Sequence, residues 1–312
     1  MSTGSAGYTE VADWERLPVR RVATNGIELS VVDYGEGPAV VLCHGFPELA
    51  FSWRHQVYPL AEAGFRVLIP DMRGYGDSSR PEDPDGYDAL TLAADLVGLL
   101  DALGLADAVF VGHDWGASTV WNLALAHPDR VRAVAGLSVP ITPRSPAPPI
   151  PILRKRLGDG FYMVWFQEPG VADAVLNADV RRTLLSDDID AAAWQSAADE
   201  ESPPRPFMTE AELDVFVRTF ERTGFTGGLN YYRAMDRTWE RTEPLAGRTI
   251  DCPSMFLTGS EDLVARFMSA DRLGAVLTDL RENVRLEGAG HWVQQERPDE
   301  VTGALLRFLQ AL

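Results

Sequence analysis

The stretch Val109–Ala117, which reads Val-Phe-Val-Gly-His-Asp-Trp-Gly-Ala, constrains the fold of this chain more than any other. An apolar run ends at its third residue, a short turn with a glycine on each side follows, and the next residues have the pattern of an amphipathic helix. A strand, a sharp turn and a helix in this order form a nucleophile elbow, where a Cβ on Gly112 or Gly116 would collide with neighbouring backbone. The residue in the nucleophile position of this predicted turn is Asp114.

An aspartate at this position restricts the chemistry. Serine at an elbow attacks a carbonyl carbon, but a carboxylate that did so would give only a reactive anhydride. A carboxylate is better suited to displace a leaving group from a saturated carbon, which leaves an ester on Asp114. An esterase is disfavoured because Ser118 lies a full helical turn beyond the elbow. The alternative without chemistry is that Asp114 only caps the helix that follows.

Strand-like and helix-like segments alternate through the rest of the chain. Two β-rich runs flank Asn25-Gly26, which predicts a hairpin. Apolar runs without alternation suit strands that are buried on both faces of a parallel sheet, and they span 39–43, 65–69, 108–111, 131–138 and 255–259. One more strand is expected near 283–286, and helical patterns cover 51–63, 90–103 and the segment from 299. This order predicts an α/β fold with a mostly parallel central sheet flanked by helices.

A proline-rich segment interrupts this alternation. Six prolines fall between Pro140 and Pro151, which excludes a regular element there. From this point to about residue 243 the sequence has helical patterns and aromatic residues but no buried-strand run. We therefore predict a core made of residues 1–139 and 244–312, with an inserted helical cap, or lid, made of residues 140–243.

The charge and composition of the chain exclude some partners. Its 312 residues carry a formal net charge of −18 at pH 7, which argues against nucleic acid and anionic membrane surfaces. No apolar run is long enough for a membrane span, and the first seven residues lack the apolar core of a signal peptide, so we expect a cytoplasmic protein. Cys43 and Cys252 stand in no metal-binding or CxxC spacing, so we expect free thiols, no metal and no cofactor. The oligomeric state stays open between monomer and homodimer.

An ester on Asp114 needs a base for its hydrolysis, and His291 is the candidate. It lies in Gly288-Ala289-Gly290-His291-Trp292, after the last predicted strand, where glycines allow a loop to bring the ring over the elbow. An orienting acid is expected between nucleophile and histidine in chain order. Asp262 and its neighbour Glu261 both follow the strand at 255–259, whereas the segment 139–143 offers no acid. We expect structural roles for the other histidines, which are His44, His55, His113 and His127.

The motif His44-Gly45-Phe46-Pro47-Glu48 follows the first buried strand. Its glycine allows the chain to turn so that the N–H of Phe46 and the N–H of Trp115 point at one oxygen. In an ester of Asp114, this oxygen belongs to the aspartyl carboxyl group in its tetrahedral intermediate. We therefore predict that these two backbone amides form the oxyanion hole.

Three motifs, His-Gly-Phe-Pro-Glu at 44–48, Gly-His-Asp-Trp-Gly at 112–116 and Gly-His-Trp at 290–292, together resemble those of the soluble epoxide hydrolases of the α/β-hydrolase family. The resemblance runs from about Trp14 to the C-terminus. It implies an enzyme that opens an epoxide to a vicinal diol through a covalent ester on Asp114, which water activated by His291 hydrolyses. It also implies that Asp262 is the orienting acid, and that a small-molecule epoxide and water are the partners.

Two stretches of the predicted cap extend the resemblance. Tyr-Met-Val-Trp-Phe-Gln-Glu-Pro-Gly at 162–170 and Gly-Leu-Asn-Tyr-Tyr-Arg at 228–233 resemble the family segments that carry two proton-donating tyrosines, which implies Tyr162 and Tyr232 in these roles. An epoxide opens to an alkoxide, and two phenols that are protonated at neutral pH can hold and protonate its oxygen. Tyr231 could be confused with Tyr232, but adjacent side chains on a helix point about 100° apart.

Several aromatic residues and a proline are predicted to line the substrate pocket, namely Phe46, Pro47, Trp115, Trp165 and Phe166. Two other functions stay open. A haloalkane or haloacid dehalogenase would use the same aspartate and histidine, but phenylalanine at position 46 supplies no side-chain donor for a halide. A non-catalytic ligand receptor with a hydrolase fold would keep the pocket and either lose a catalytic residue or turn over slowly.

Overall fold

The protein is described from a computed structural model, which covers residues 10–187, 189–195 and 203–312. Residues 1–9, which carry the expectation of a missing signal peptide, lie outside the described residues. Within these ranges eight strands form one sheet in the order β1-β2-β4-β3-β5-β6-β7-β8. The strands are β1 (Val19–Thr24), β2 (Ile27–Tyr34), β3 (Ala39–Cys43), β4 (Arg66–Pro70), β5 (Ala108–His113), β6 (Val131–Leu137), β7 (Ser254–Gly259) and β8 (Leu280–Leu286). Since β2 pairs antiparallel with β1 and β4 and all other pairs are parallel, the predicted mostly parallel sheet is confirmed.

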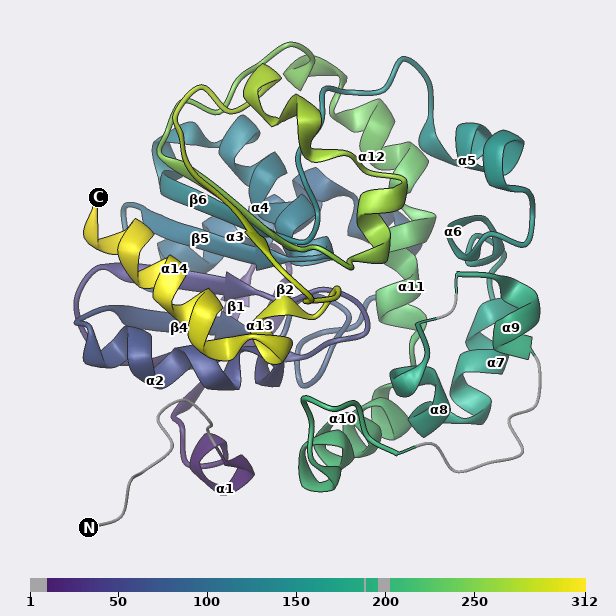
Figure 1. Cartoon of the computed structure of the whole chain (residues 1–312), viewed down its shortest axis with the longest axis horizontal. Coiled ribbons are helices and arrows are strands. Elements are labelled where there is room, and N and C mark those ends of the chain that lie inside the picture. The colour runs from purple at the N-terminus through teal and green to yellow at the C-terminus, as the bar shows by residue number, and fades with distance from the viewer. Residues whose placement is uncertain (1–9, 188, 196–202) are drawn as a thin grey trace.

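Helices cover both faces of the sheet, as Figure 1 shows. The helices α2 (Arg54–Glu62), α13 (Val293–Glu296) and α14 (Pro298–Gln310) pack on one face, and α3 (Ala89–Ala102) and α4 (Trp115–Ala126) pack on the other. Successive residues of β3 point into the two cores in turn, and every residue of β3 and β5 is buried. Burial on both faces is the reason that these strands read as unbroken apolar runs in the sequence.

The local signals in the sequence account for most element boundaries. Asn25 and Gly26 have φ values of 41° and 76°, both positive as a type I′ hairpin turn requires, so the predicted hairpin is confirmed. The expected helix at 51–63 begins as a 3₁₀ turn, η1 (Ala50–Trp53), and continues as α2. The strand expected near 283–286 begins earlier, at Leu280. It lies at the edge of the sheet. Its residues alternate between half-buried and exposed, which leaves no apolar run in the sequence.

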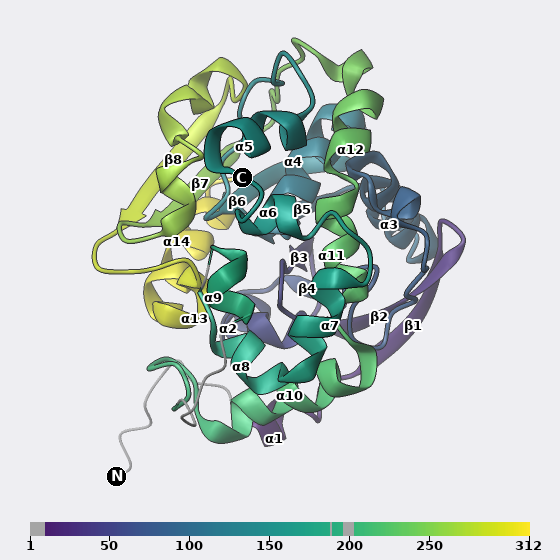
Figure 2. The ribbon, with the colours of Figure 1, turned by 90° about the vertical axis from the view of Figure 1, so that its right-hand side faces the viewer.

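Eight helices lie between β6 and β7 in the described part of the chain, where the sequence predicts a helical cap. They are α5 (Pro149–Leu157), α6 (Tyr162–Trp165), α7 (Val171–Ala178), α8 (Val180–Leu185), α9 (Ala191–Gln195), α10 (Glu210–Thr223), α11 (Thr226–Arg233) and α12 (Met235–Arg241). The prediction that the proline-rich segment holds no regular element is wrong at its end, because α5 begins at Pro149 and the first turn of a helix accepts proline. Figure 2, which looks onto this side of the molecule, shows α6, α7, α9 and α11 in front of the sheet. The cap boundaries at residues 140 and 243 stay a prediction.

The remaining elements are short. They are α1 (Val11–Trp14), η2 (Pro84–Tyr87), η3 (Pro128–Arg130), η4 (Glu243–Leu245), η5 (Leu263–Arg266) and η6 (Ala270–Ala275).

A buried arginine joins this helical segment to the core. The Nε of Arg54 donates to Glu212 of α10 at 2.6 Å, and its Nη1 donates to Gln295 of α13 at 2.7 Å. Arg54 is fully buried, so its charge depends on these partners for solvation. One guanidinium therefore holds α10 of the cap and α13, which follows the His291 loop, in fixed positions relative to each other.

The turn between β5 and α4 has the geometry of a nucleophile elbow. Asp114 has φ 52° and ψ −118°, a backbone conformation that L-residues rarely adopt. A Cβ on Gly112 would overlap the carbonyl oxygen of Gly116, and a Cβ on Gly116 would overlap the carbonyl oxygen of Cys43 at the end of β3. The two glycines are needed because helix and strands approach closely on both sides of the aspartate.

We expect Gly116→Ala to destabilise the protein by about 1–3 kcal/mol or more, because the added methyl meets backbone atoms that cannot rotate away. Denaturant unfolding measures the change in the free energy of unfolding. Gly274→Ala is the matched control, since a Cβ at that position meets no atom within 4 Å. Equal stability of the two variants would contradict the close approach at the elbow.

Candidate active site

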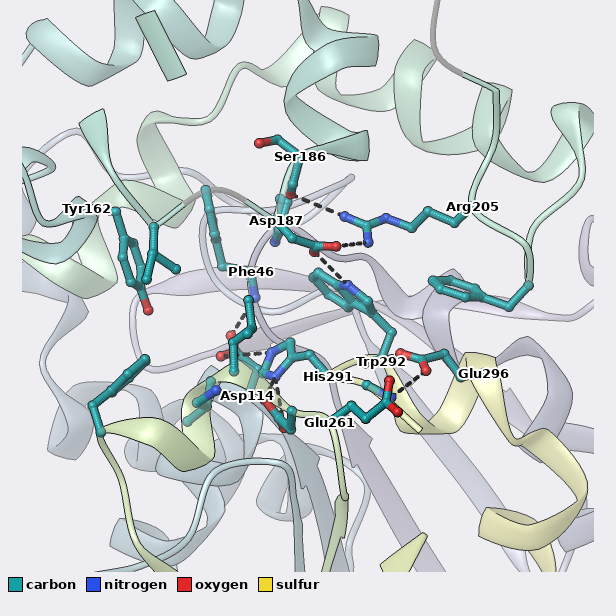
Figure 3. Close-up of a pocket in the computed structure, with 18 of the residues that line it drawn as sticks. Phe46, Asp114, Tyr162, Ser186, Asp187, Arg205, Glu261, His291, Trp292 and Glu296 are labelled. Atoms are coloured by element: carbon teal, nitrogen blue, oxygen red, sulfur yellow. Dashed lines mark hydrogen bonds and ion pairs between the residues drawn. The ribbon is translucent and has the colours of Figure 1, made fainter. Parts of the chain in front are cut away.

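The carboxyl ends of β3, β5 and β7 bring the sequence-predicted residues together. Asp114 stands on the elbow after β5, and its Oδ1 accepts a hydrogen bond from the backbone N–H of Phe46 at 2.9 Å. Its Oδ2 lies 3.5 Å from Nε2 of His291 (Figure 3). A Cβ on Gly45 would overlap Oδ1 of Asp114, so only a glycine allows the loop after β3 to approach the carboxylate. Within the described residues, no hydrogen bond joins the N–H of Trp115, the second predicted oxyanion donor, to this carboxylate.

Asp262 orients the histidine. Nδ1 of His291 lies 3.0 and 3.1 Å from the two carboxylate oxygens of Asp262, which also accepts the N–H of Val264 at 2.9 Å. Burial would raise the pKa of Asp262, but the charge and hydrogen bond of His291 outweigh it and lower the pKa. Glu261 lines the same cavity, and the hydrogen bonds of the described residues include none between it and His291. The geometry therefore selects Asp262 over its neighbour.

The two carboxylates also control the protonation of His291. Burial by itself lowers the pKa of this imidazole. The charge of Asp262, together with hydrogen bonds to Asp114 and Asp262, outweighs burial and holds the pKa well above its usual value. In the free protein, His291 is therefore protonated at neutral pH and bridges two negative groups.

Four hydrogen bonds hold the backbone of the His291 loop. Glu296 accepts the N–H of Gly290 at 2.6 Å and the N–H of Trp292 at 2.9 Å. The carbonyl of His291 accepts from Nε2 of His113 at 2.8 Å and from Oγ of Ser138 at 2.7 Å. The loop is thus anchored on both sides of the ring, which leaves His291 little freedom to rotate away from Asp114.

A buried ion pair that the sequence analysis did not assign lies behind the elbow. Glu48 accepts from the N–H of Gly45 at 2.7 Å, from Nδ1 of His113 at 2.7 Å and from Nε2 of Gln294 at 2.8 Å. Both ring nitrogens of His113 face oxygen atoms, Glu48 on one side and the His291 carbonyl on the other, so the ring links the two loops. Burial would raise the pKa of Glu48, but the charge and hydrogen bond of His113 lower it to about 2. The only signal for this pair in the sequence is a carboxylate at the end of the His-Gly-Phe-Pro-Glu motif.

The other histidines have the structural roles expected of them. The ring of His44 accepts the N–H of Met72 at Nε2 and donates from Nδ1 to the carbonyl of Gly45. His127 forms the C-cap of α4, and His55 is buried in the core.

Two phenols from the cap face the nucleophile. Tyr162 of α6 and Tyr232 of α11 both line the cavities that reach Asp114, and their ring centroids lie 5.8 Å apart. Burial and the charges of Asp114 and Asp262 raise the pKa of Tyr162 well above its usual value. Burial, Tyr162 and the charge of Asp114 do the same for the pKa of Tyr232, and a hydrogen bond from the indole of Trp115 partly opposes them. Both phenols are therefore protonated and able to donate. Tyr231 instead donates to the carbonyl of Arg73 at 2.8 Å and lines neither of these cavities.

Two cavities meet at the nucleophile. Cavity 1 has a volume of about 580 Å³ and contains His291, Phe46, Pro47 and Phe166 in its wall. Cavity 2 has a volume of about 520 Å³ and contains Trp115 in its wall. The residues that line both are Asp114, Tyr162, Tyr232, Val264 and Phe267. The prediction that Trp165 lines the pocket is wrong for both cavities: it is buried beside Phe166, because adjacent side chains of a helix point in different directions.

Other expected features can be examined in the described part of the chain. Cys43 and Cys252 are free cysteines, as predicted. The described residues include no group of three or more His, Cys, Asp or Glu side chains that could hold a metal ion. No helix of the described residues is long and apolar enough to cross a membrane.

Comparison with known proteins agrees with this geometry. Residues 38–298 match the family described as the alpha/beta hydrolase fold, and the chain belongs to this family. Its relatives include epoxide hydrolases. The chain is 51% identical to epoxide hydrolase A of Mycobacterium tuberculosis, over 94% of this chain and 97% of that protein, and 43% identical to epoxide hydrolase 1 of Siraitia grosvenorii, over 95% and 99%. The crystal structure of epoxide hydrolase A from Mycobacterium thermoresistibile superimposes with a TM-score of 0.88 at 51% identity, covering 94% of this chain and 98% of that one.

The depressed pKa of Glu48 makes its contribution to stability dependent on pH. A carboxyl with a folded-state pKa of about 2 and an ordinary value of 4.5 stabilises the fold above about pH 4.5, and this stabilisation is lost as the pH falls toward 2. We expect Glu48→Gln to lower the free energy of unfolding by about 3–5 kcal/mol at pH 7, because the substitution breaks the buried pair of Glu48 with His113. The difference from wild type should shrink between about pH 4.5 and pH 2.

Denaturant unfolding at a series of pH values measures this difference. Glu62→Gln on the exposed side of α2 serves as control and should run parallel to wild type. A Glu48→Gln difference that stayed constant over the acidic range would contradict the buried ion pair.

Proposed function

We propose that this protein hydrolyses an epoxide to a vicinal diol through a covalent ester on Asp114. The observation that supports this most is the convergence of a carboxylate and two protonated phenols where the two cavities meet. A nucleophile and donors for the departing oxygen are the two groups that opening of an epoxide requires.

The first step forms the ester. Oδ2 of Asp114 attacks one carbon of the oxirane, and the bond between that carbon and the ring oxygen breaks. Tyr162 and Tyr232 hydrogen-bond to this oxygen, and one of them transfers its proton to the developing alkoxide. Phe46 keeps the other carboxylate oxygen of Asp114 in place.

Ester formation also changes the state of His291. In the free protein the negative charge of Asp114 helps to hold a proton on the imidazole. An alkylated Asp114 is neutral, so this support is lost and the pKa of His291 falls. The proton that His291 releases restores the phenol that gave up its own. The neutral imidazole is then ready to act as a base.

The second step breaks the ester. His291 removes a proton from a water molecule in cavity 1, and the hydroxide attacks the carboxyl carbon of Asp114. The tetrahedral oxyanion forms where the Phe46 amide already donates, and we assign the Trp115 amide as its second donor. Asp262 stabilises the imidazolium. Collapse of the intermediate breaks the bond between the carboxyl carbon and the substrate oxygen. The leaving alkoxide takes the proton of the hydroxyl group that water added, so the diol leaves and Asp114 is again a carboxylate.

The two other functions considered from the sequence are not favoured by any observation in the described residues. The two phenols can protonate a departing alkoxide, whereas a departing halide needs no proton. A complete set of nucleophile, base and orienting acid argues against a receptor that has lost catalysis.

We expect His291→Gln to accumulate the ester, because alkylation does not need the base but hydrolysis does. Intact mass spectrometry after addition of an aryl or alkyl epoxide should show a gain of one substrate mass. The double variant with Asp114→Asn and His291→Gln is the control and should keep the mass of the protein. A folded His291→Gln variant that binds the epoxide without any gain in mass would contradict the covalent route.

Removal of either phenol should slow the first step. We expect Tyr232→Phe and Tyr162→Phe each to reduce the rate of alkylation by up to about 10²–10³-fold, the usual cost of losing one donor to a developing charge, with the remaining phenol limiting the loss. Single-turnover measurement of ester formation isolates this step. Tyr231→Phe is the matched control on the same helix, because its hydroxyl contacts the carbonyl of Arg73. Slow alkylation in Tyr231→Phe with normal alkylation in Tyr232→Phe would reverse the assignment.

A further inference from the structure

Helix α6, which carries the first phenol, is too short to fix its own position. It consists of only four residues, Tyr162–Trp165. Isolated helices this short are not stable in water, so contacts with the rest of the cap must hold α6 in place. A group that donates a proton in a reaction needs its position defined to within about 0.5 Å. The position of the Tyr162 hydroxyl therefore depends on the contacts that join α6 to its neighbours.

Gln167, two residues beyond α6, forms such a contact. Its Nε2 donates to the carbonyl of Met163 in α6 at 2.8 Å and to the carbonyl of Tyr232 in α11 at 2.9 Å. The nitrogen of a side-chain amide carries two hydrogens, so it can donate to both carbonyls at once. Both carbonyls lie in the last turn of their helices, where the backbone donor four residues further on is lost. One amide thus joins the backbones of α6 and α11, which lie side by side in Figure 2, next to the two phenols.

The other contacts between these helices hold them together with less directional precision at the phenols. The ring of Phe166 contacts both phenols, with centroids 5.5 Å from Tyr162 and 5.1 Å from Tyr232. Burial of apolar surface is not directional, so this packing does not fix where the two hydroxyls point. Arg233 donates from Nε to the carbonyl of Phe166 at 3.0 Å and pairs with Asp173. This pair keeps the cap folded when the amide is removed, and the amide then controls only the fine placement of the phenols.

We propose that Gln167 is a positioning residue for ring opening, whose amide holds the two phenols so that both hydroxyls reach the same epoxide oxygen. The assignment rests on the proposed function and adds a residue that acts on the substrate only through Tyr162 and Tyr232. The lining of the two cavities, as far as the structure describes it, does not include Gln167. Hydrolysis of the ester depends on His291 and on the Phe46 amide. Loss of the amide bridge should therefore slow alkylation and leave hydrolysis unchanged.

The test measures the two steps separately in Gln167→Met, which keeps the length of the side chain and removes its two donors. In single-turnover experiments with an aryl epoxide, we expect alkylation to slow by about 10–100-fold, the usual cost of misplacing a reacting group, and decay of the ester to stay within about twofold of wild type. Gln167→Glu should slow alkylation as well, because its carboxylate faces two carbonyls and donates to neither. Gln310→Met, at an exposed position at the end of α14, is the matched control and should keep both wild-type rates.

A double-variant cycle separates positioning of the phenols from a general distortion of the cap. In the Tyr162→Phe background only one phenol remains to be placed, so Gln167→Met should slow alkylation by less than about threefold there. If Gln167→Met does not fold, Gln167→Glu takes its place in the cycle.

Three outcomes would overturn the assignment and leave the proposed function intact. They are normal alkylation in a folded Gln167 variant, equal slowing of alkylation and hydrolysis, and the same slowing of alkylation with and without the Tyr162 hydroxyl. The absence of any covalent ester, both in wild type and in His291→Gln, would count against the proposed function instead.

Discussion

The structure of the site depends on how closely the elbow approaches the end of β3. Gly116 lies against the carbonyl oxygen of Cys43, and Gly45 lies against the carboxylate of Asp114, with no room for a Cβ at either contact. Because β3 and β5 are parallel neighbours, their carboxyl ends meet at the same edge of the sheet. These two contacts bring the Phe46 amide within 2.9 Å of the nucleophile. The position of the donor is therefore a consequence of sheet register rather than of a flexible loop.

The charged groups around the elbow lie in two layers. In the front layer, the imidazolium of His291 lies between Asp114 and Asp262. In the back layer, His113 pairs with the buried Glu48 and donates to the carbonyl of His291. The back layer keeps its charge during the proposed reaction, whereas the front layer loses the charge of Asp114 when the ester forms. A change of charge at one residue can thus alter the protonation of His291 without moving the loop that carries it.

The sequence predicts the parts of the fold and site that depend on local pattern. Buried parallel strands read as apolar runs, so the sequence predicts β3 with the bounds that the structure has, and the elbow follows from glycine spacing. The acid that orients His291 follows from chain order and family resemblance. Features that depend on tertiary packing were not predictable. Trp165 and Phe166 are both aromatic, yet only Phe166 reaches a cavity. Glu48 carries no pattern that separates it from surface charges, because its partners His113 and Gln294 come from distant segments.

The two cavities differ in what they bring to the nucleophile. His291 and Asp262 line only cavity 1, so the base can act on water only from that side. Trp115 and the long face of α4 line only cavity 2, which provides an apolar surface for a chain. Asp114 and both phenols line both cavities. In the proposed reaction, a substrate in cavity 2 presents its epoxide where the cavities meet, and water attacks the ester carbon of Asp114 from cavity 1. The substrate and the hydrolytic water then do not compete for the same space.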